Sequence, residues 1–593
     1  MYLNVFYVVH YFIRIRNNCS VVLVLIDEYH ALEIVLMGVF KMSKVDRYYV
    51  HSCHHRSDDT NCNAVVVKEQ ICKHNDDGTE TWEPYLRVIK DPTRSFYITK
   101  NQYRNHAYKK EFEDINKLEE FKCKDSELRE RLANALGCGY RRYVGLRDLC
   151  SSPYVYGADI DTETLIKQAY LKIQPEGKSA KITVGAFDIE TEVYGEGRIN
   201  VITFIHEREI YTVALKESCK IYSASDDILD IDVNVRPRQA TYEECLSVVN
   251  SIIGEELTKN KFTLHLELVG SELELLQTIF KHIHECKTDI VGIWNILFDI
   301  PKILERLNVL GVDPREIFCP PNLPKRYCVC EFKEDINPNA EHMVDKWHWF
   351  SCTGYTQFID SMCLYGRLRK VDGKDISYSL DYISNKELGQ GKLHLGEITN
   401  HRWSQTYDFL RYIAYNINDV LIMQLMEFKN HDIDSLIGLS DCSLLKNFSK
   451  QTVMVRDGDY VYAKENGHIP ASAGVSMYTE WDSEMPKAGG TVLPPEKAVG
   501  TRACVMQGTS GRTQVSLFVN DLDESSMYPS ALRLANISKE TYYGSVLNIN
   551  GYDKIHIELL GQVTISPEAY CVQAYKLFLD LPDYEEMEKC LGL

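Results

Sequence analysis

The stretch KITVGAFDIET at Lys181–Thr191 decides the fold of the central part of this chain. It is a short apolar run of the kind that forms a buried strand, and it ends in two acids, Asp188 and Glu190. Side chains two residues apart on a strand point to the same face, so both carboxylates should face one way. Asn200–Ile205 is expected to be the hairpin partner. We therefore expect a sheet in which one strand carries a pair of acids.

Further along the chain, helical and strand patterns alternate. Tyr242–Ile253 and Ser271–Cys286 have the apolar periodicity of amphipathic helices. Pro301 is expected to open another helix. Phe358–Tyr365 resembles a strand, and Tyr407–Phe428 predicts a long helix. Strands that alternate with helices predict an α/β core.

Three more acidic segments follow in order: WNILFD at Trp294–Asp299, YNIND at Tyr415–Asp419 and DLDESSMYPS at Asp521–Ser530. Asp299 follows a strand-like run and Asp419 lies on the predicted long helix, so folding can bring both to the first pair of acids. Tyr415 precedes Asp419 by one helical turn, which places the phenol and the carboxylate on one helix face. Converging carboxylates are what two-metal phosphodiester hydrolysis requires. Mg²⁺ prefers such oxygen ligands, and Mn²⁺ is the alternative ion.

Length and charge limit the classes of protein that fit. A chain of 593 residues should hold several domains. A net charge of −19 argues against a protein that coats DNA broadly, because phosphate contacts need Lys and Arg. The 19 cysteines are spread over a long chain and indicate reduced thiols. Neither the pair Cys328 and Cys330 nor the group Cys53, His54, His55 and Cys62 has the ligand spacing of a structural zinc site.

The first 41 residues differ from the rest. Val21–Phe40 is apolar, but Asp27, Glu28 and Glu33 interrupt it, so we expect no membrane span there. A more ordinary globular sequence begins at Met42, and we expect that translation starts there.

Taken together, the acidic segments resemble family B DNA polymerases, and within them the replicative polymerases of T-even-like phages. FDIET, WNILFD and YNIND resemble the three exonuclease motifs, with WNILFD one residue shorter than usual. AGGTV at Ala488–Val492 resembles the loop between the exonuclease and polymerase regions, and DLDESSMYPS resembles polymerase motif A. The resemblance extends from Pro92 to Thr541.

The resemblance implies roles for individual residues. Four carboxylates would bind two Mg²⁺ ions of a 3′→5′ proofreading site: Asp188, Glu190, Asp299 and Asp419. Tyr415 would position the attacking water. Asn295 and Phe298 would hold the 3′-terminal nucleotides, the Phe by stacking on a base.

In motif A, Asp523 would bind the polymerase metals. Ser526, Met527 and Tyr528 would lie against the incoming nucleotide. The family's triphosphate-gripping lysine, second catalytic aspartate and basic thumb have no counterpart in this sequence. Asp457–Tyr460 superficially resembles that second aspartate motif but precedes motif A, and its Asp-Gly pair predicts a hairpin turn.

The implied fold is a mixed α+β multidomain protein with an RNase H-like exonuclease domain. We expect an extension at 1–41, an N-terminal domain at 42–180, the exonuclease domain at 181–430, a return to the N-terminal domain at 431–500, and a partial palm at 501–593. Within the N-terminal domain, Phe112–Leu136 predicts a charged helix.

The implied function is that of the N-terminal part of a DNA-directed DNA polymerase with proofreading activity. Its partners would be a single-stranded DNA 3′ end, a primer-template and a C-terminal polymerase chain, without which no dNTP would be incorporated. The implied setting is the cytoplasm of a phage-infected bacterial cell. The alternatives are a stand-alone 3′→5′ exonuclease and a non-catalytic DNA-binding remnant.

Overall fold

The computed structural model describes residues 45–473, apart from gaps at 58–61, 76, 107–109, 111, 138–144, 176–177, 194, 223–236, 338–339, 341, 371–372 and 394–400. Beyond residue 473 it describes five strands. The chain divides into two compact units, Met1–Met477 and Tyr478–Leu593. The extension that precedes Met42 and motif A both lie outside the described residues.

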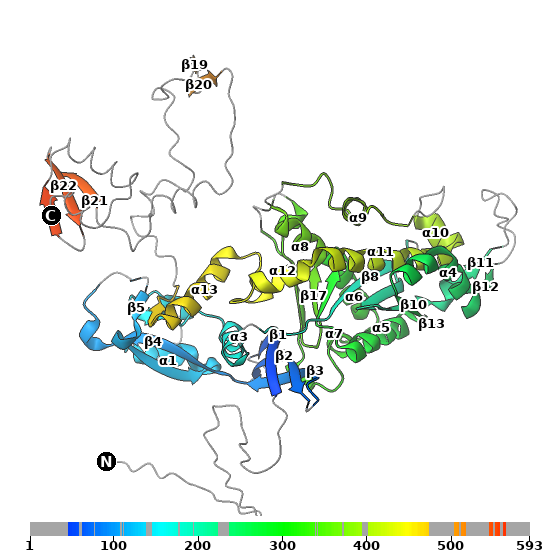
Figure 1. Cartoon of the computed structure of the whole chain (residues 1–593), viewed down its shortest axis with the longest axis horizontal. Coiled ribbons are helices and arrows are strands. Elements are labelled where there is room, and N and C mark those ends of the chain that lie inside the picture. The colour runs from blue at the N-terminus through cyan, green and yellow to red at the C-terminus, as the bar shows by residue number, and fades with distance from the viewer. Residues whose placement is uncertain are drawn as a thin grey trace, which may run out of the picture. The chain divides into compact units, whose positions relative to one another are not determined.

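The first unit begins with small antiparallel sheets (Figure 1). One consists of β1 (Val45–Ser57), β2 (Cys62–His74) and β3 (Glu80–Lys90). A second has the order β6 (Leu118–Lys124), β4 (Thr93–Thr99) and β7 (Val155–Tyr156). Three helices accompany them: α1 (Leu128–Ala135), α2 (Leu146–Cys150) and α3 (Thr162–Ile173).

The central feature is a six-stranded mixed sheet. Its order is β13 (Thr263–Val269), β10 (Glu209–Leu215), β9 (Ile199–His206), β8 (Val184–Thr191), β14 (Ile290–Ile293) and β17 (Gln357–Asp360). β8, β9 and β10 form an antiparallel meander, whereas β14 and β17 run parallel to β8. The sheet confirms the predicted α/β core and the hairpin between Lys181–Thr191 and Asn200–Ile205.

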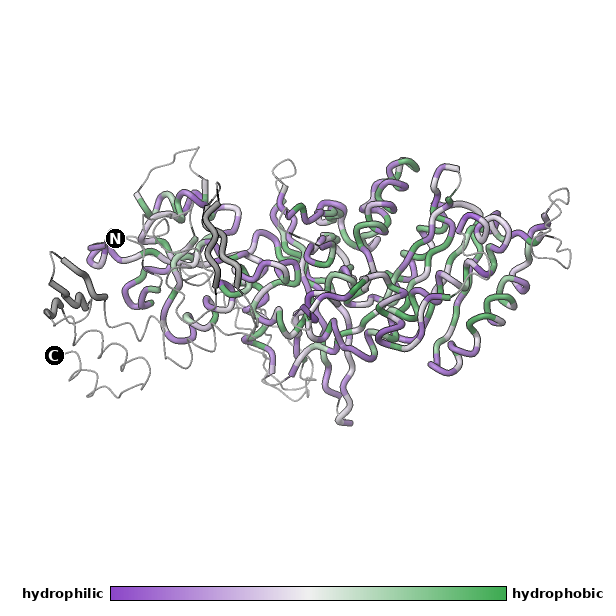
Figure 2. Tube along the Cα trace, turned by 90° about the horizontal axis from the view of Figure 1, so that it is seen from above, coloured by the Kyte–Doolittle hydropathy of each residue, from purple (hydrophilic) through white to green (hydrophobic). Residues whose placement is uncertain are grey.

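Helices cover both faces of this sheet (Figure 1). α4 (Tyr242–Lys259) and α11 (Phe409–Asn430) pack on one face, and α5 (Glu272–Cys286) and α6 (Ile296–Val309) pack on the other. Strand β9 shows why both faces are buried: Val201 and Ile205 enter the first core, while Ile202 and Phe204 enter the second. Apolar residues accordingly run through the strands and helices of this region (Figure 2).

Shorter elements complete the unit. The helices are α7 (Pro314–Phe318), α8 (Ser361–Leu368), α9 (Leu380–Leu388), α10 (His401–Tyr407), α12 (Asp432–Leu439) and α13 (Gln451–Glu465). Two hairpins are β11 (Lys220–Ile221) with β12 (Arg238–Gln239), and β15 (Cys330–Lys333) with β16 (Trp349–Cys352). After the central sheet the chain returns to its beginning, because β18 (His468–Pro470) pairs with β5 (Phe112–Asp114).

Three local predictions were wrong. Phe112–Leu136 is not one helix but contains β5, β6 and the short α1. Charged residues occur on exposed edge strands as well as on exposed helices, so the charge pattern did not distinguish the two. Pro301 does not open α6, which begins five residues earlier; a proline is tolerated near a helix start, where fewer backbone bonds are lost. Asp457–Tyr460 forms no turn and lies inside α13, where Asp457 is fully buried.

Phe358–Tyr365 is a strand only as far as Asp360, after which α8 begins with the Asp360 side chain accepting from the Cys363 N–H. In the second unit, β19 (Ala503–Gly508) pairs with β20 (Gly511–Ser516). There β21 (Ser545–Ile549), β22 (Tyr552–Ile557) and β23 (Gly561–Thr564) form an antiparallel sheet. Within the described residues, no helix has both the length and the apolar character needed to cross a membrane.

Candidate active site

Strand β8 places two carboxylates on the face of the sheet that α11 covers. Phe187 and Ile189 enter the opposite core, whereas Ala186 lies in the core that α11 lines. Asp188 and Glu190 share the alternation of Ala186 and therefore face α11. The predicted common face of the two acids is confirmed.

Asp299 lies in the first turn of α6, directly after the parallel strand β14. It is buried, and its Oδ1 accepts a hydrogen bond from the backbone N–H of Ile189 at 3.2 Å. This bond ties the helix to the peptide between the two acids of β8. Asp299 therefore lies beside the β8 carboxylates, in the first turn of a helix that follows a strand.

Helix α11 contributes a polar stripe on an otherwise apolar, buried helix: Tyr412, Tyr415, Asn416 and Asp419. Their spacing of three, four and seven residues places them on one face. The Tyr412 hydroxyl donates to Glu190 Oε2 at 2.5 Å, and the Asn416 amide donates to Asp188 Oδ2 at 2.7 Å. The stripe therefore holds both carboxylates of β8 in place.

Lys392 completes the site from the segment after α9. Its Nζ lies 2.6 Å from Asp419 Oδ2 and donates to the Tyr415 hydroxyl at 3.0 Å. Burial opposes the charge of this lysine, but Asp419 and Tyr415 outweigh it and raise the pKa of Lys392. A cation thus joins the tyrosine and the aspartate that the sequence placed one helical turn apart.

The four carboxylates share a strongly negative, poorly solvated space. Burial first, then the neighbouring charges of Asp299, Glu190 and Asp419, raise the pKa of Asp188. Burial also raises the pKa of Glu190 to about 7, of Asp299 to about 8 and of Asp419 to about 6. Two hydrogen bonds and one ion pair oppose these shifts: Tyr412 on Glu190, the Ile189 N–H on Asp299, and Lys392 on Asp419.

These residues fit a divalent cation. Carboxylate oxygens of Asp188, Glu190 and Asp419 lie within 4.8 Å of one another, while Asp299 is not part of that group. Asp419 Oδ1 is buried and has no hydrogen-bond partner among the residues that the structure describes. An oxygen-only donor set of mutually repelling carboxylates favours Mg²⁺ or Mn²⁺ over softer ions. A cation here would offset both the burial and the mutual repulsion that raise the pKa values of these carboxylates.

Two predicted nucleotide-binding residues flank the carboxylates at the start of α6. Asn295 precedes the helix, and its Oδ1 is buried with no hydrogen-bond partner in the structure. Phe298 is 49% exposed although it adjoins the buried Asp299. An exposed ring beside buried acids is available for stacking on a base. The roles of both residues remain predictions.

The four predicted motif A residues, Asp523, Ser526, Met527 and Tyr528, lie outside the described residues. Conversely, the sequence reasoning missed Tyr412, Asn416 and Lys392. A polar stripe at helical spacing around Tyr415 was a readable signal for the first two. Lys392 had no local signal, because only the fold brings its loop to α11.

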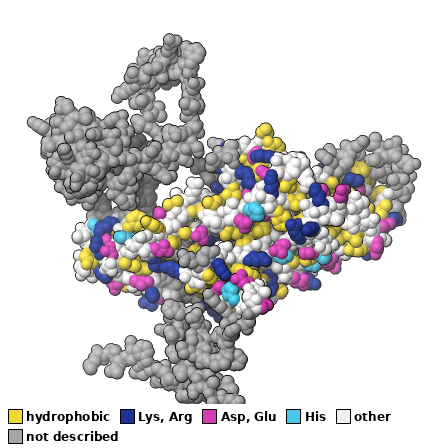
Figure 3. All heavy atoms as spheres, viewed as in Figure 1, with side chains coloured by type: hydrophobic (Ala, Val, Ile, Leu, Met, Phe, Trp, Pro, Cys, Tyr) yellow, Lys and Arg dark blue, Asp and Glu magenta, His cyan; other side chains and the backbone are white. Residues whose placement is uncertain are grey.

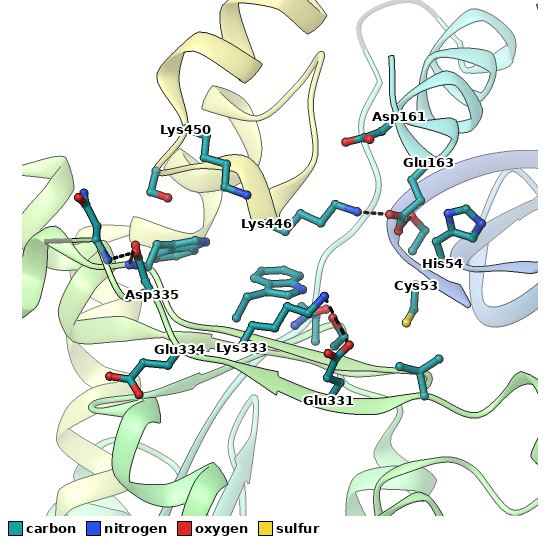
Figure 4. A pocket seen from close by; sticks show the side chains of 18 of the residues that line it. Cys53, His54, Asp161, Glu163, Glu331, Lys333, Glu334, Asp335, Lys446 and Lys450 are labelled. Carbon is teal, nitrogen blue, oxygen red and sulfur yellow. Dashed lines mark hydrogen bonds and ion pairs between the residues drawn. The ribbon is translucent and has the colours of Figure 1, made fainter. Parts of the chain in front are cut away.

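A cavity of about 670 Å³ lies apart from the carboxylates, between β1, α3, the β15–β16 hairpin and the segment before α13 (Figure 4). Two of its lysines are paired with acids: Lys446 forms an ion pair with Glu163, and Lys333 lies 3.4 Å from Glu331. The outer surface is likewise mixed, with basic and acidic side chains interspersed on the face that Figure 3 shows. Neither feature presents a broad basic field for duplex DNA.

The comparison with protein families gives the class of this domain. Residues 156–383 match the family model described as DNA polymerase family B, exonuclease domain. Over these residues the chain is similar to the exonuclease domain of family B DNA polymerases, a class that performs 3′→5′ exonuclease chemistry with divalent metals. The match includes Asp188, Glu190 and Asp299 and ends before α11. Among curated proteins, none matches the chain.

Proposed function

We propose that this chain removes nucleotides from the 3′ end of single-stranded DNA, using two Mg²⁺ or Mn²⁺ ions. The observation that carries the proposal is the convergence of Asp188, Glu190 and Asp419 within 4.8 Å, on elements that also hold Asp299. Ions bound there would supply an activated water and would neutralise charge on the scissile phosphate.

Side chains of the site orient the carboxylates, the attacking water and the DNA. Tyr412 and Asn416 orient the two β8 carboxylates toward the cation site. Lys392 holds the Tyr415 phenol and Asp419 in one arrangement, from which the phenol can orient a water by hydrogen bonding. Phe298 stacks on a base near the 3′ end, and the Asn295 amide binds the adjacent nucleotide. Asp299 adds a fourth carboxylate for the second ion.

The test is Mg²⁺-dependent shortening of a 5′-labelled single strand by the full chain. A ladder of stepwise shorter products is expected, with circular single-stranded DNA left intact. Asp188→Ala should abolish the ladder, while Glu305→Gln on the exposed side of α6 should leave it unchanged. Cleavage of the circle, or activity that survives in Asp188→Ala, would contradict the proposal.

We further infer that this activity proofreads for a family B polymerase site to which Asp523 contributes a metal-binding carboxylate. The support is the sequence DLDESSMYPS at Asp521–Ser530, which resembles motif A. The expectation is checked by dNTP incorporation on a primer-template when this chain is combined with a complementary chain that carries the fingers, the rest of the palm and the thumb, with Asp523→Ala as the variant. Incorporation that is indifferent to Asp523→Ala would contradict this role, and the exonuclease assay would be unaffected by that result.

A further inference from the structure

A second group of metal-binding residue types lies at one end of the β1–β2–β3 sheet, in a part of the sequence without a motif. The strand register places Asp46 opposite Cys72, and His74 opposite Glu80. Residues opposite each other in antiparallel strands point to the same face. Three strands therefore bring a thiol, an imidazole and two carboxylates together.

The ligand atoms of this group lie close enough to one another to hold a metal ion. Ligand atoms of Cys72, His74 and Glu80 lie within 4.8 Å of one another. Cys72 Sγ is 4.0 Å from His74 Nε2, and His74 Nδ1 is 3.4 Å from Glu80 Oε1. Bonds of 2.0–2.3 Å to a tetrahedral Zn²⁺ would hold such atoms about 3.3–3.6 Å apart. The 3.4 Å between His74 Nδ1 and Glu80 fits that geometry. The 4.0 Å contact of Cys72 Sγ is to Nε2, so the thiol side chain would rotate to bind an ion held at Nδ1.

Asp46 fixes the imidazole in a ligating orientation. Its Oδ2 lies 2.8 Å from His74 Nε2. When the neutral imidazole donates this N–H to Asp46, Nδ1 presents its lone pair to the Glu80 carboxylate. A metal-binding histidine usually makes such a bond to a carboxylate through its other nitrogen. A cation between Nδ1 and Glu80 would turn a repulsion into an attraction.

An independent observation comes from Tyr48 on β1. Its side chain is fully buried, and its hydroxyl has no hydrogen-bond partner in the structure. Tyr48 lies two residues after Asp46 on β1, so its side chain shares the face of the sheet on which Asp46 lies opposite Cys72. A buried hydroxyl without a partner is costly. A water on a cation bound by the group would give it one.

We propose that Cys72, His74 and Glu80 bind a divalent transition ion of the Zn²⁺ class, with Asp46 holding the imidazole and a water in the fourth position. Thiolate and imidazole select such an ion over Mg²⁺, so this site and the carboxylate site bind different metals. The ion would join β1, β2 and β3 through their side chains. Lys178, whose Nζ lies 3.1 Å from Glu80 on the exposed side, is the cation that competes for Glu80.

The test uses the full chain, stripped with chelator under reducing conditions and then titrated with Co²⁺. A thiolate-to-cobalt charge-transfer band that saturates at one equivalent, and is abolished by Zn²⁺, is expected. Asp46→Asn should weaken binding roughly 10–100-fold, as loss of such a hydrogen-bonded carboxylate does, and Cys72→Ser should remove the band. Cys123→Ser, which changes a buried thiol of β6, is the matched control and should keep it.

Lys178→Met separates metal binding from damage to the fold. Loss of the competing cation should tighten Co²⁺ binding several-fold, an improvement that a structural defect would not produce. His74→Asn should bind Co²⁺ only weakly, even when its circular dichroism spectrum matches that of the unaltered chain. Absence of the band in the unaltered chain, or its survival in Cys72→Ser, would overturn the proposal.

Discussion

Lys392 joins two functional side chains of α11 that would otherwise be linked only through the helix. Its ammonium contacts both Asp419 and the Tyr415 hydroxyl, and it lowers the pKa that burial has raised on Asp419. A lysine in this position can therefore set both the orientation of the phenol and the ionisation of the carboxylate.

Lys392→Met should lower the kcat of the exonuclease roughly 10–100-fold, since charge-assisted hydrogen bonds contribute about 1.5–3 kcal/mol. Without the ammonium, the pKa of Asp419 should rise above about 6, so the acidic limb of the kcat profile should move to higher pH. The measurement is kcat against pH at limiting Mg²⁺. Lys386→Met, which removes the α9 partner of an ion pair with Asp375, is the control. If the acidic limb of the kcat profile does not move in Lys392→Met, Lys392 does not control the ionisation of Asp419.

At this scale, the predictable features were those carried by local spacing. The strand alternation predicted the common face of Asp188 and Glu190, and the helical turn predicted that of Tyr415 and Asp419. Lys392 reaches Asp419 from 27 residues away along the chain. No periodicity encodes a contact of that kind, because it depends on how the sheet and the helices pack together.

Among the elements, β8 depends on glycine. A Cβ on Gly185 would lie 2.1 Å from the carbonyl oxygen of Ile205 on β9, and backbone atoms cannot move aside cheaply. The close approach of these strands sets the position of Asp188, three residues further on.

Gly185→Ala should therefore destabilise the protein by roughly 1–3 kcal/mol, the usual cost of overpacking, and reduce exonuclease activity with it. Gly254→Ala is the matched control, because its Cβ would meet Asn250 at an ordinary 3.6 Å inside α4. There alanine should stabilise by roughly 0.5–1 kcal/mol. Urea unfolding measures both changes. Equal stability of Gly185→Ala and the unaltered chain would show that the strands can separate at this point.

Element type was predictable where one pattern dominated, as in α5, whose predicted face holds the buried Leu276, Phe280 and Ile283. It was not predictable for Phe112–Leu136, where β6 is an edge strand with few buried positions. Nor did the sequence show that α6 starts at Ile296, because its first turn is fixed by packing after β14 and not by a capping side chain.

On the scale of the first unit, one buried ion pair links the β1–β2–β3 sheet to the central sheet. Lys68 Nζ on β2 lies 2.6 Å from Asp289 Oδ1, and both side chains are fully buried. Asp289 also accepts from Gln70 on β2 and from Thr183, which precedes β8. Such long-range pairs cannot be read from sequence, since nothing local distinguishes these residues from exposed ones.

Asp289→Ala should destabilise the protein by about 3–5 kcal/mol, because it leaves a buried lysine without its counter-charge. Adding Lys68→Met should restore part of that loss. Glu83→Ala, which breaks an exposed pair with Lys73, should cost less than about 1 kcal/mol. The free energies of unfolding in urea are compared for the unaltered chain, Asp289→Ala, the double variant and Glu83→Ala. A double variant less stable than Asp289→Ala would show that Lys68 contributes instead through its hydrogen bonds to the carbonyl oxygens of Lys287 and Tyr355.

The stability of the whole protein should also depend jointly on pH and Mg²⁺. The raised pKa values of Glu190, Asp299 and Asp419, from about 6 to about 8, mean that the folded state without metal favours their protonated forms. Protonation of these three carboxyl groups contributes its full stabilisation below their ordinary pKa values near 4, and this stabilisation is lost as the pH rises through 6 to 8. Mg²⁺ binds the ionised forms, so its effect on Tm should be small at pH 5 and large at pH 8.

At 100 times its dissociation constant, Mg²⁺ should add about 2.7 kcal/mol at pH 8. Thermal unfolding with chelator or with Mg²⁺ at pH 5, 6.5 and 8 measures the difference, and the thiol-containing site on β2 does not interfere because it disfavours Mg²⁺. The double variant Asp188→Asn/Glu190→Gln removes two buried charges, so with chelator at pH 8 it should be more stable than the unaltered chain. It should also lose most of the increase in Tm that Mg²⁺ produces. A Mg²⁺ effect of equal size at every pH would mean that the carboxylates are already ionised in the folded protein, and that burial does not control their charge.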